Sequence, residues 1–326
     1  MAARMIIDGH NDLVLRTLKG DEIHHVHLDA AAEADFCGGF FALFVPSPQP
    51  EKPESDHYAL PLPEPVPREE AARVAAEMYE VFRSLPIELA TSPDDFRPGR
   101  VAAILHLEGA EPLAPDLSDL DDWYGRGLRS VGLVWSRAND FAEGVPFRFP
   151  SSPDTGPGLT AAGKDLVRRC NELGILVDLS HLNEAGFWDV ARLSSAPLVA
   201  THSNAHALCA STRNLTDAQL DAIGESGGIV GINFAVSFLR EDGLNEADTP
   251  LSEIIRHAEY VAGRIGVDHV AFGSDFDGAL VSSELDGIRG LPGLVDEFRS
   301  AGWDEETVAK LTHRNWLRVL GETWRG

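Results

Sequence analysis

Short apolar runs alternate with longer amphipathic segments along most of this chain. Eight runs have the length and composition of buried strands, at about 5–8, 39–45, 101–107, 129–135, 175–180, 197–201, 228–234 and 268–274. The amphipathic segments predict helices near 68–84, 116–126, 159–173, 184–194, 216–226, 251–265, 292–301 and 304–320. Capping residues support two of these helices, because Thr160 opens a helix that ends at Gly174 and Thr216 opens the helix after next.

This alternation of strands and helices predicts parallel βαβ units. Eight such units in one chain favour a closed (β/α)8 barrel of the TIM type over an open doubly wound sheet, and we expect a single domain over residues 1–326. No GxGxxG follows the first run, which counts against a dinucleotide-binding sheet. Eight of the 20 prolines lie between Pro46 and Pro67, so we expect an extended loop over 46–67. In a barrel, this loop would lie beside the active-site face.

The composition narrows the classes of partner. The chain has 52 acidic and 27 basic residues and a formal net charge of -25, which opposes binding to nucleic acid or to an anionic membrane. Three widely spaced cysteines provide no disulfide framework and fit a reducing compartment. Only four residues precede the first run, and no apolar run approaches the ~18 residues of a membrane span. We therefore expect a soluble, cytoplasmic protein.

Polar residues that can bind metals or transfer protons follow several of the apolar runs. His10 and Asp12 end the first run, and residues two apart on a strand point the same way. Active sites of barrels form at the carboxyl ends of the strands, so the residues at run ends are expected to converge. The residues at the ends of five runs are His10 and Asp12, Glu108, His181, His202, and Asp275.

Three histidines, two aspartates and one glutamate at one rim match the needs of a two-metal hydrolytic site. Imidazole and carboxylate groups are ligands for zinc, one carboxylate can bridge two ions, and a further acid can transfer protons. The pattern therefore predicts a barrel of the metal-dependent hydrolase kind.

Other histidines are weaker candidates. His24, His25 and His27 end no strand and are expected to be solvated or edge residues. His106 lies two residues before Glu108 and is expected to be a buried layer residue. His206 follows His202 by four residues, but His202 ends a strand, so the two should not share a helix face. Neither a serine nucleophile elbow nor a cysteine motif for catalysis is present.

The chain resembles the membrane (renal) dipeptidase family of metallopeptidases nearly from end to end. The opening segment Asp8-Gly9-His10-Asn11-Asp12 is similar to the family's signature. The other matching segments are Leu107-Glu108-Gly109, Asp178-Leu179-Ser180-His181, Thr201-His202-Ser203, Cys209-Ala210-Ser211-Thr212-Arg213-Asn214, Gly273-Ser274-Asp275-Phe276-Asp277-Gly278 and Asn315-Trp316-Leu317-Arg318-Val319.

The resemblance implies two zinc ions per chain, with His10 and Asp12 on one ion, His181 and His202 on the other, and Glu108 bridging both. A hydroxide between the ions would attack the peptide carbonyl, and Asp275 would pass the proton of the bridging water to the leaving amine. Arg213 would pair with the terminal carboxylate of the substrate. The family also implies small dipeptide substrates, acceptance of a C-terminal D-residue, and a homodimer.

Two departures from the family affect these expectations. Animal members carry a substrate-binding histidine where this chain has Trp135, so stabilisation of the carbonyl by that residue is in doubt. Animal members also have a secretory signal and a lipid-anchor tail, and without these features the chain resembles a soluble bacterial member. Arg137, two residues past Trp135, is either paired with a local acid such as Asp140 or Glu143 or faces the pocket, where it would favour an acidic C-terminal residue.

Two further functions remain open from the sequence. The same groups and Arg213 would serve a hydrolase of another small amide, such as a β-lactam or an N-acyl amino acid. A non-catalytic metal-binding barrel is the other alternative, although binding alone does not require the acid at Asp275.

Overall fold

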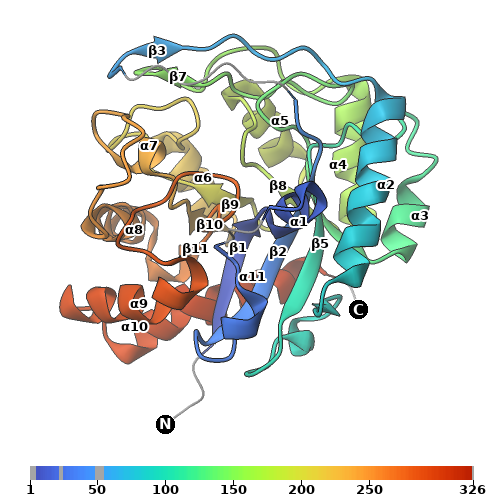
Figure 1. Cartoon of the computed structure of the whole chain (residues 1–326). Coiled ribbons are helices and arrows are strands. Elements are labelled where there is room, and N and C mark those ends of the chain that lie inside the picture. The colour runs from blue at the N-terminus through green and yellow to red at the C-terminus, as the bar shows by residue number, and fades with distance from the viewer. Residues whose placement is uncertain (1–4, 22–24, 48–54, 325–326) are drawn as a thin grey trace.

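Eight parallel strands form the centre of the molecule in the computed structural model, which describes residues 5–21, 25–47 and 55–324 (Figure 1). Neighbouring strands in the sheet follow the order of the chain. Their bounds are β1 Ile6–Asn11, β2 Phe36–Phe44, β5 Ala102–Glu108, β6 Leu128–Gly132, β8 Leu176–Asp178, β9 Val199–Ser203, β10 Ile229–Ile232 and β11 Val270–Phe272. Each of the eight predicted runs overlaps one of these strands, so the strand prediction is confirmed. A short strand, β4 (Glu88–Leu89), also pairs with β5.

The sheet closes between its last strand and its first. The backbone N–H of Asp275, just past β11, donates to the carbonyl of His10 over 3.1 Å. The N–H of Asp12 donates to the carbonyl of Phe276 over 2.8 Å, and the side chain of Asp8 accepts from the N–H of Ser274 over 2.7 Å. The predicted (β/α)8 barrel is therefore confirmed, and its closure lies beside the candidate site.

Helices surround the barrel. The predicted helices correspond to α2 Arg68–Ser84, α3 Leu120–Gly125, α4 Ala161–Leu173, α5 Glu184–Leu193, α6 Asp217–Glu225, α8 Ser252–Ile265 and α9 Leu291–Ser300. The two predicted caps are confirmed, because the hydroxyl of Thr160 accepts from Gly163 and that of Thr216 accepts from Gln219. The prediction of one helix over 304–320 was wrong in detail, since a π-helical turn at Lys310–Arg314 separates α10 (Glu305–Ala309) from α11 (Asn315–Thr323).

Two helices were not predicted from the sequence. They are α1 (Leu13–Lys19) and α7 (Val236–Leu239), and both are short. Both begin a few residues after the carboxyl end of a barrel strand, so their positions depend on the barrel as much as on local pattern. Among the described residues, no helix combines the length and the apolar character that a transmembrane segment requires. All three cysteines are buried.

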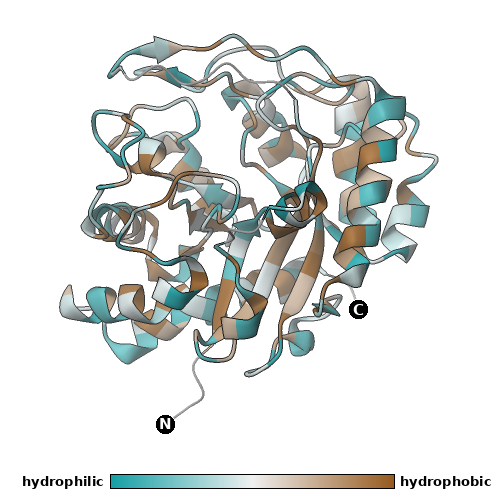
Figure 2. Cartoon of the chain, in the orientation of Figure 1, coloured by the Kyte–Doolittle hydropathy of each residue, from teal (hydrophilic) through white to brown (hydrophobic). Residues whose placement is uncertain are grey.

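The interior of the barrel is filled by apolar side chains at the end opposite to the candidate site. Ile7, Phe40 and Ile104 from three strands pack in one buried cluster with Trp316 of α11. The indole N–H of Trp316 donates to the carbonyl of Phe272 over 3.0 Å, which satisfies its one polar group in the core. A second, larger cluster lies between the strands and the surrounding helices. In Figure 2, strands β2 and β5 are mainly brown, and teal positions gather on helices and loops.

A two-stranded ribbon lies at the top of the view in Figure 1, beyond the carboxyl ends of the barrel strands. It pairs β3 (Tyr58–Ala59) antiparallel with β7 (Arg148–Phe149). Strand β3 belongs to the proline-rich loop predicted over 46–67, of which residues 48–54 lie outside the described part. Tyr58 and Phe149 pack with Cys209 in a small buried cluster, so this part of the loop is attached to the barrel top.

Candidate metal centre and active site

The six predicted site residues converge at the carboxyl end of the barrel, although they come from five separate strands. Three of them lie within strands: His10 is in β1, Glu108 is the last residue of β5, and His202 is in β9. His181 and Asp275 follow β8 and β11 by three residues, and both adopt left-handed backbone conformations, with φ of 65° and 60°. Non-glycine residues rarely adopt this conformation, and such strain concentrates at functional sites.

The carboxylate of Glu108 lies at the centre of the cluster. One oxygen, Oε2, is 3.4 Å from Nε2 of His10, and the other, Oε1, is 3.1 Å from Nε2 of His181 and 3.8 Å from Nε2 of His202. Asp12 lies on the His10 side, with Oδ2 3.6 Å from Nε2 of His10. The ligand atoms form two compact groups that share Glu108, one with His10 and Asp12 and one with His181 and His202.

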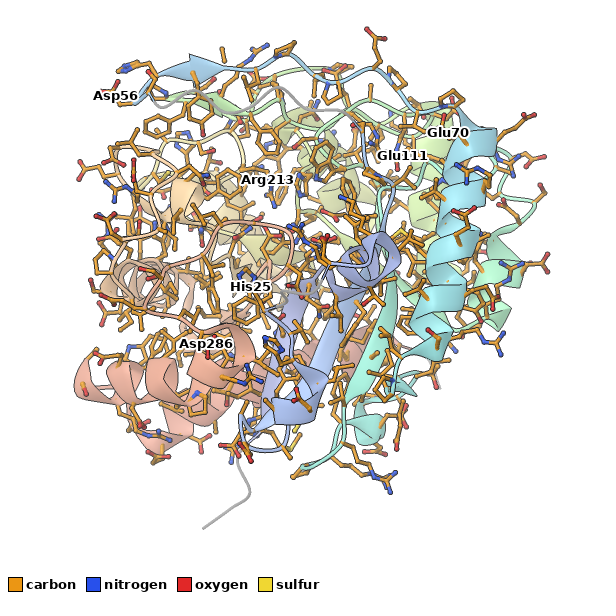
Figure 3. All side chains as sticks on the ribbon, in the orientation of Figure 1. His25, Asp56, Glu70, Glu111, Arg213 and Asp286 are labelled. Atoms are coloured by element: carbon orange, nitrogen blue, oxygen red, sulfur yellow. The ribbon has the colours of Figure 1, made fainter. Side chains whose placement is uncertain are left out.

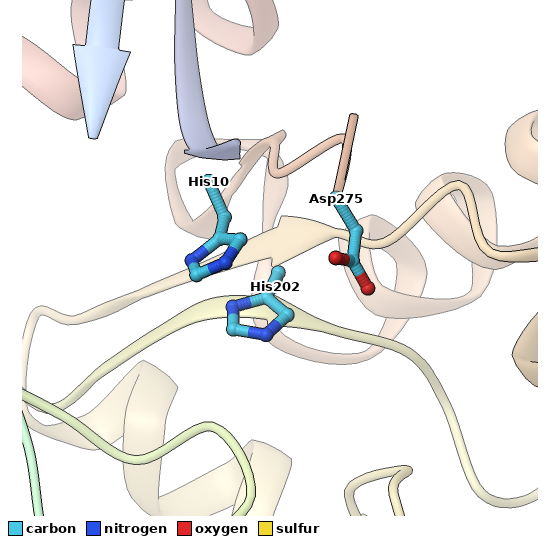
Figure 4. A group of neighbouring side chains, drawn as sticks. All are labelled: His10, His202 and Asp275. Atoms are coloured by element: carbon cyan, nitrogen blue, oxygen red, sulfur yellow. The ribbon is translucent and has the colours of Figure 1, made fainter. Parts of the chain in front are cut away.

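A third group joins His10 and His202 to Asp275. The two imidazole rings stack with their centroids 3.9 Å apart, and the carboxylate of Asp275 lies beside them (Figure 4). The amide of Asn233 donates to Oδ2 of Asp275 over 2.9 Å and thereby orients the carboxylate. Gly278 permits this arrangement, because a Cβ atom there would lie 2.2 Å from Oδ2 of Asp12 and 2.5 Å from Oδ1 of Asp275.

The residues fit a pair of divalent cations. Both ring nitrogens of His10 and Oδ1 of Asp12 are buried and have no hydrogen-bond partner among the described residues. Burial raises the pKa of Glu108 to about 7, because the charged carboxylate loses water. Burial alone would lower the pKa of His10, but Glu108 and Asp12 raise it well above its ordinary value. A buried cluster with this excess of carboxylates is stabilised by cations, and imidazole with carboxylate is a donor set suited to zinc.

Hydrogen bonds behind the cluster set the direction of two imidazoles. The hydroxyl of Thr201 donates to Oδ2 of Asp178 over 2.6 Å, so its oxygen accepts from Nδ1 of His202 at 2.8 Å. This leaves the Nε2 lone pair of His202 directed at the cluster. Nδ1 of His181 lies 2.9 Å from the hydroxyl of Ser136 in a similar arrangement. Burial lowers the pKa of both imidazoles well below the ordinary value, so both are neutral and able to bind a metal.

A cavity of about 700 Å³ opens above these residues. The cluster residues that line it are Asp12, Glu108, His181 and Asp275. Aromatic side chains, including Trp135, line another part, and Arg16 and Lys19 of α1 contribute to the lining as well. The cavity is large enough for a small peptide.

Arg213 is buried beside the cavity (Figure 3). Its guanidinium donates to the carbonyl of His202 over 2.9 Å and to the hydroxyl of Ser203 over 3.3 Å, while its Nε has no partner among the described residues. The guanidinium carbon lies 5.6 Å from the ring centroid of Phe238, which lines the cavity. Arg213 itself is not part of the cavity lining.

Arg137 does not pair with Asp140 or Glu143, and that expectation was wrong. Its side chain is fully buried, and Nε donates to Oε1 of Glu111 over 2.8 Å. A second nitrogen, Nη2, donates to the carbonyl of Val45 over 2.7 Å. Arg137 is also absent from the cavity lining, so its charge is directed at Glu111 rather than at the cavity.

The weaker histidine candidates do not belong to the cluster. His106 is buried one layer below, with Nδ1 2.9 Å from the hydroxyl of Ser130, and burial lowers its pKa to about 3, so the prediction of a buried layer residue is confirmed. Nδ1 of His25 accepts from the N–H of Asp277 over 2.9 Å, and His206 contacts the carbonyl of Ser151. His24 lies outside the described residues.

Several supporting residues were missed by the sequence analysis. Asn233 directly follows β10, but it lies inside the predicted run 228–234, so a search for polar residues after each run did not reach it. Ser136 and Thr201 are adjacent in sequence to residues already considered, but hydroxyl groups at such positions are too common to single out. Nothing in the sequence indicates that Glu111 pairs with Arg137, because the two residues are far apart along the chain.

The sequence as a whole matches the model of one family, described as membrane dipeptidase (peptidase family M19), over residues 1–325. The chain belongs to the membrane dipeptidase family. Dipeptidase tcpJ of Claviceps purpurea is 30% identical over 307 residues, which cover 91% of this chain and 69% of the relative. An uncharacterized protein in the pqqA 5' region of Klebsiella pneumoniae is 52% identical over 225 residues, covering 69% of this chain and 83% of the relative.

Solved structures agree with this family membership. A metallo peptidase from Rhodobacter sphaeroides, liganded with a phosphinate mimic of the dipeptide L-Ala-D-Ala, is 46% identical with a TM-score of 0.94 and covers 99% of this chain and 100% of its own. The probable dipeptidase PvdM from Pseudomonas aeruginosa is 25% identical with a TM-score of 0.80, covering 98% of this chain and 95% of its own. The family and these structures support a peptide hydrolase that acts on dipeptides and uses a metal.

Proposed function

We propose that this protein hydrolyses small dipeptides at a binuclear zinc centre and accepts a D-residue at the C-terminal position. The observation that carries the proposal is the sharing of Glu108 by two groups of buried ligands. The structure from Rhodobacter sphaeroides holds a mimic of L-Ala-D-Ala, and its similarity to this chain supports the stereochemical part.

Each residue of the cluster has a role in this proposal. His10 and Asp12 would hold one ion, His181 and His202 the other, and Glu108 would bridge them. When bound, the ions would polarise the peptide carbonyl and lower the pKa of a water molecule that acts as the nucleophile. The hydrogen bonds from Thr201 and Ser136 would keep the two neutral imidazoles of the second pair directed at their ion.

Asp275 is the proposed proton carrier. Its carboxylate faces the cavity, Asn233 fixes one oxygen, and the second lies toward Asp12. In this position Asp275 can take a proton from the attacking water and deliver it to the nitrogen of the leaving amino acid. The amide of Asn233 can donate to the carboxylate throughout, so the orientation of Asp275 survives a change in its protonation.

Arg213 is the proposed partner of the terminal carboxylate of the substrate. Two of its nitrogens are held by His202 and Ser203, so the plane of the guanidinium is fixed, and burial increases the strength of a charge-assisted hydrogen bond. An amino acid bound there would lie beside Phe238 and within the cavity region next to His181.

A substrate comparison with zinc-loaded protein tests the proposal. The panel contains L-Ala-D-Ala, L-Ala-L-Ala, a β-lactam and an N-acetyl amino acid, with free amino acid release as the measurement. Turnover of the dipeptides is the expected result. Preferential turnover of the β-lactam or the N-acyl amino acid would support the other amide hydrolases, and zinc binding without any turnover would support a non-catalytic barrel.

A further inference from the structure

Four aromatic rings form a continuous surface on one side of the cavity. We call Phe44, Trp135, Phe147 and Phe238 the aromatic wall, and all four line the cavity. Neighbouring rings are in contact, with centroid distances of 5.0 Å from Phe44 to Trp135, 5.7 Å from Trp135 to Phe147 and 6.1 Å from Phe147 to Phe238. The wall also touches the candidate metal centre, because the Trp135 ring lies 5.8 Å from that of His181.

The charged groups that line the cavity lie elsewhere. The acidic ones are Asp12, Glu108, Asp275, Asp277 and Glu246, and the basic ones are Arg16 and Lys19. Arg16 is engaged, since it donates to the carbonyl of Asp277 and pairs with Asp21. A ligand side chain that contacts the aromatic wall would therefore meet apolar surface with mostly acidic groups across the cavity.

In the described part of the chain, two cations lie against the wall, Arg213 beside Phe238 and Arg137 beside Trp135 and Phe44, and Arg137 is paired with an acid. The guanidinium carbon of Arg137 lies 5.7 Å from the centroid of Trp135 and 5.9 Å from that of Phe44. Its charge is paired with Glu111, which is buried as well. Arg137 thus supports the two rings from behind with its charge paired to Glu111, and Arg213 is assigned to the terminal carboxylate rather than to the side chain of the ligand.

We propose that the aromatic wall is the subsite for the side chain of the C-terminal residue of the dipeptide and that it favours a large apolar side chain there. This inference rests on the proposed function, because Arg213 locates the terminal carboxylate beside Phe238. From that point, the side chain of the same residue reaches Phe147 and Trp135 along the ring contacts. Burying an aromatic side chain against rings is favourable, whereas an acidic side chain would lose water without gaining a partner.

Three dipeptides that differ only at the C-terminal residue test this subsite: L-Ala-D-Phe, L-Ala-D-Ala and L-Ala-D-Asp. Wild-type protein should process L-Ala-D-Phe with a kcat/KM about 10-fold or more above that of L-Ala-D-Asp. Trp135→Ala should lower kcat/KM for L-Ala-D-Phe by about 10-fold, mainly through KM, and should change L-Ala-D-Ala by less, because a methyl group makes little contact with the wall.

Trp188→Ala is the matched control, because Trp188 is a partly buried tryptophan on α5 outside the cavity lining. It should leave the ratio between the three substrates unchanged. A wild-type preference for L-Ala-D-Asp, or an equal loss for all three substrates in Trp135→Ala, would overturn the subsite. The wild-type comparison decides the matter even where Trp135→Ala does not fold.

The outcomes separate this inference from the proposed function. Turnover of L-Ala-D-Ala with no preference for L-Ala-D-Phe removes the subsite and leaves the dipeptidase. Absence of turnover on all three dipeptides removes both.

Discussion

Arg137 donates from Nε to Oε1 of Glu111 over 2.8 Å, and both side chains are buried. The pair connects the ends of three strands, because Glu111 follows β5, Arg137 follows β6 and Nη2 of Arg137 holds the carbonyl of Val45 after β2. Glu111 also lies against Gly109, where φ is 92° and a Cβ atom would be 2.1 Å from Oε2 of Glu111. The carboxylate of Glu111 thus leaves no room for a side chain at position 109, next to the central ligand Glu108.

Replacing one partner of this pair should destabilise the fold more than replacing both partners. Arg137→Met would leave a buried carboxylate without its counter-ion, at a cost of roughly 3–5 kcal/mol in the free energy of unfolding. Adding Glu111→Leu should restore much of that loss, because two apolar side chains then fill the space. Urea unfolding of both single variants and the double variant gives the comparison.

An exposed pair provides the control for this comparison. Arg73→Met breaks the i,i+4 pair of Arg73 with Glu77 on α2 and should change stability by about 0.5 kcal/mol or less. The interpretation of the buried pair fails if the double variant is as unstable as the sum of its two single variants.

The same two residues illustrate what the sequence alone could predict. Strand ends in a parallel barrel converge whatever the loops do, so a search for polar residues after apolar runs located the six residues of the cluster. The partner of Arg137 depends on which loops meet above the barrel, and a search for acids nearby in sequence therefore gave Asp140 and Glu143 instead of Glu111.

The short elements were missed for a related reason. Helices α1 and α7 have too few residues for a clear period, and each is stabilised mainly by its contacts with the rest of the barrel. The π-helical turn at 310–314 interrupts a helix whose apolar pattern runs on, so periodicity gave one helix. Asn233 was missed because the apolar run continues to Phe234, whereas the strand itself ends at Ile232.

Glu108 should be required for both metal ions. Its two carboxylate oxygens face different histidines, so Glu108→Ala removes one ligand from each group. We expect wild-type protein to bind about two ions per chain and the variant to bind fewer, with weakened affinity at both positions. Metal analysis after exhaustive dialysis measures this, with Glu172→Ala on the exposed face of α4 as the control. Retention of two tightly bound ions by Glu108→Ala would show that the bridging assignment is wrong.

Asp275 should be needed for turnover and not for metal binding. Asp275→Asn keeps the shape of the side chain but cannot carry a proton, so we expect a loss on the order of 10²-fold or more in kcat with the metal content of the wild type. Asp286→Asn, at the exposed residue labelled in Figure 3, should have wild-type kcat. Near-normal activity of Asp275→Asn would exclude Asp275 from proton transfer.

His257 on α8 should make the stability of the fold depend on pH. Its Nδ1 accepts from the N–H of Ala205 over 3.1 Å, and its Nε2 contacts the carbonyl of Leu239 at 2.9 Å, so the ring is held in its neutral form. Burial lowers the pKa of His257 from 6.5 to about 4. The unfolded chain therefore binds a proton near pH 6.5, whereas the folded chain does so only near pH 4. The contribution of neutral His257 to the free energy of unfolding is fully present above pH 6.5 and is lost as the pH falls from 6.5 to 4.

The size of this effect follows from linkage. The contribution changes by about 1.4 kcal/mol per pH unit in that window, or roughly 3 kcal/mol in total. Because other groups also titrate, the quantity to measure is the difference in unfolding free energy between wild type and His257→Gln, from urea unfolding at several pH values between 7 and 4. The wild type should lose its advantage as the pH falls. His57→Gln is the control for the substitution itself, because this side chain is 74% exposed and its removal should cost little stability. If His257→Gln runs parallel to the wild type, the buried neutral imidazole does not control acid stability.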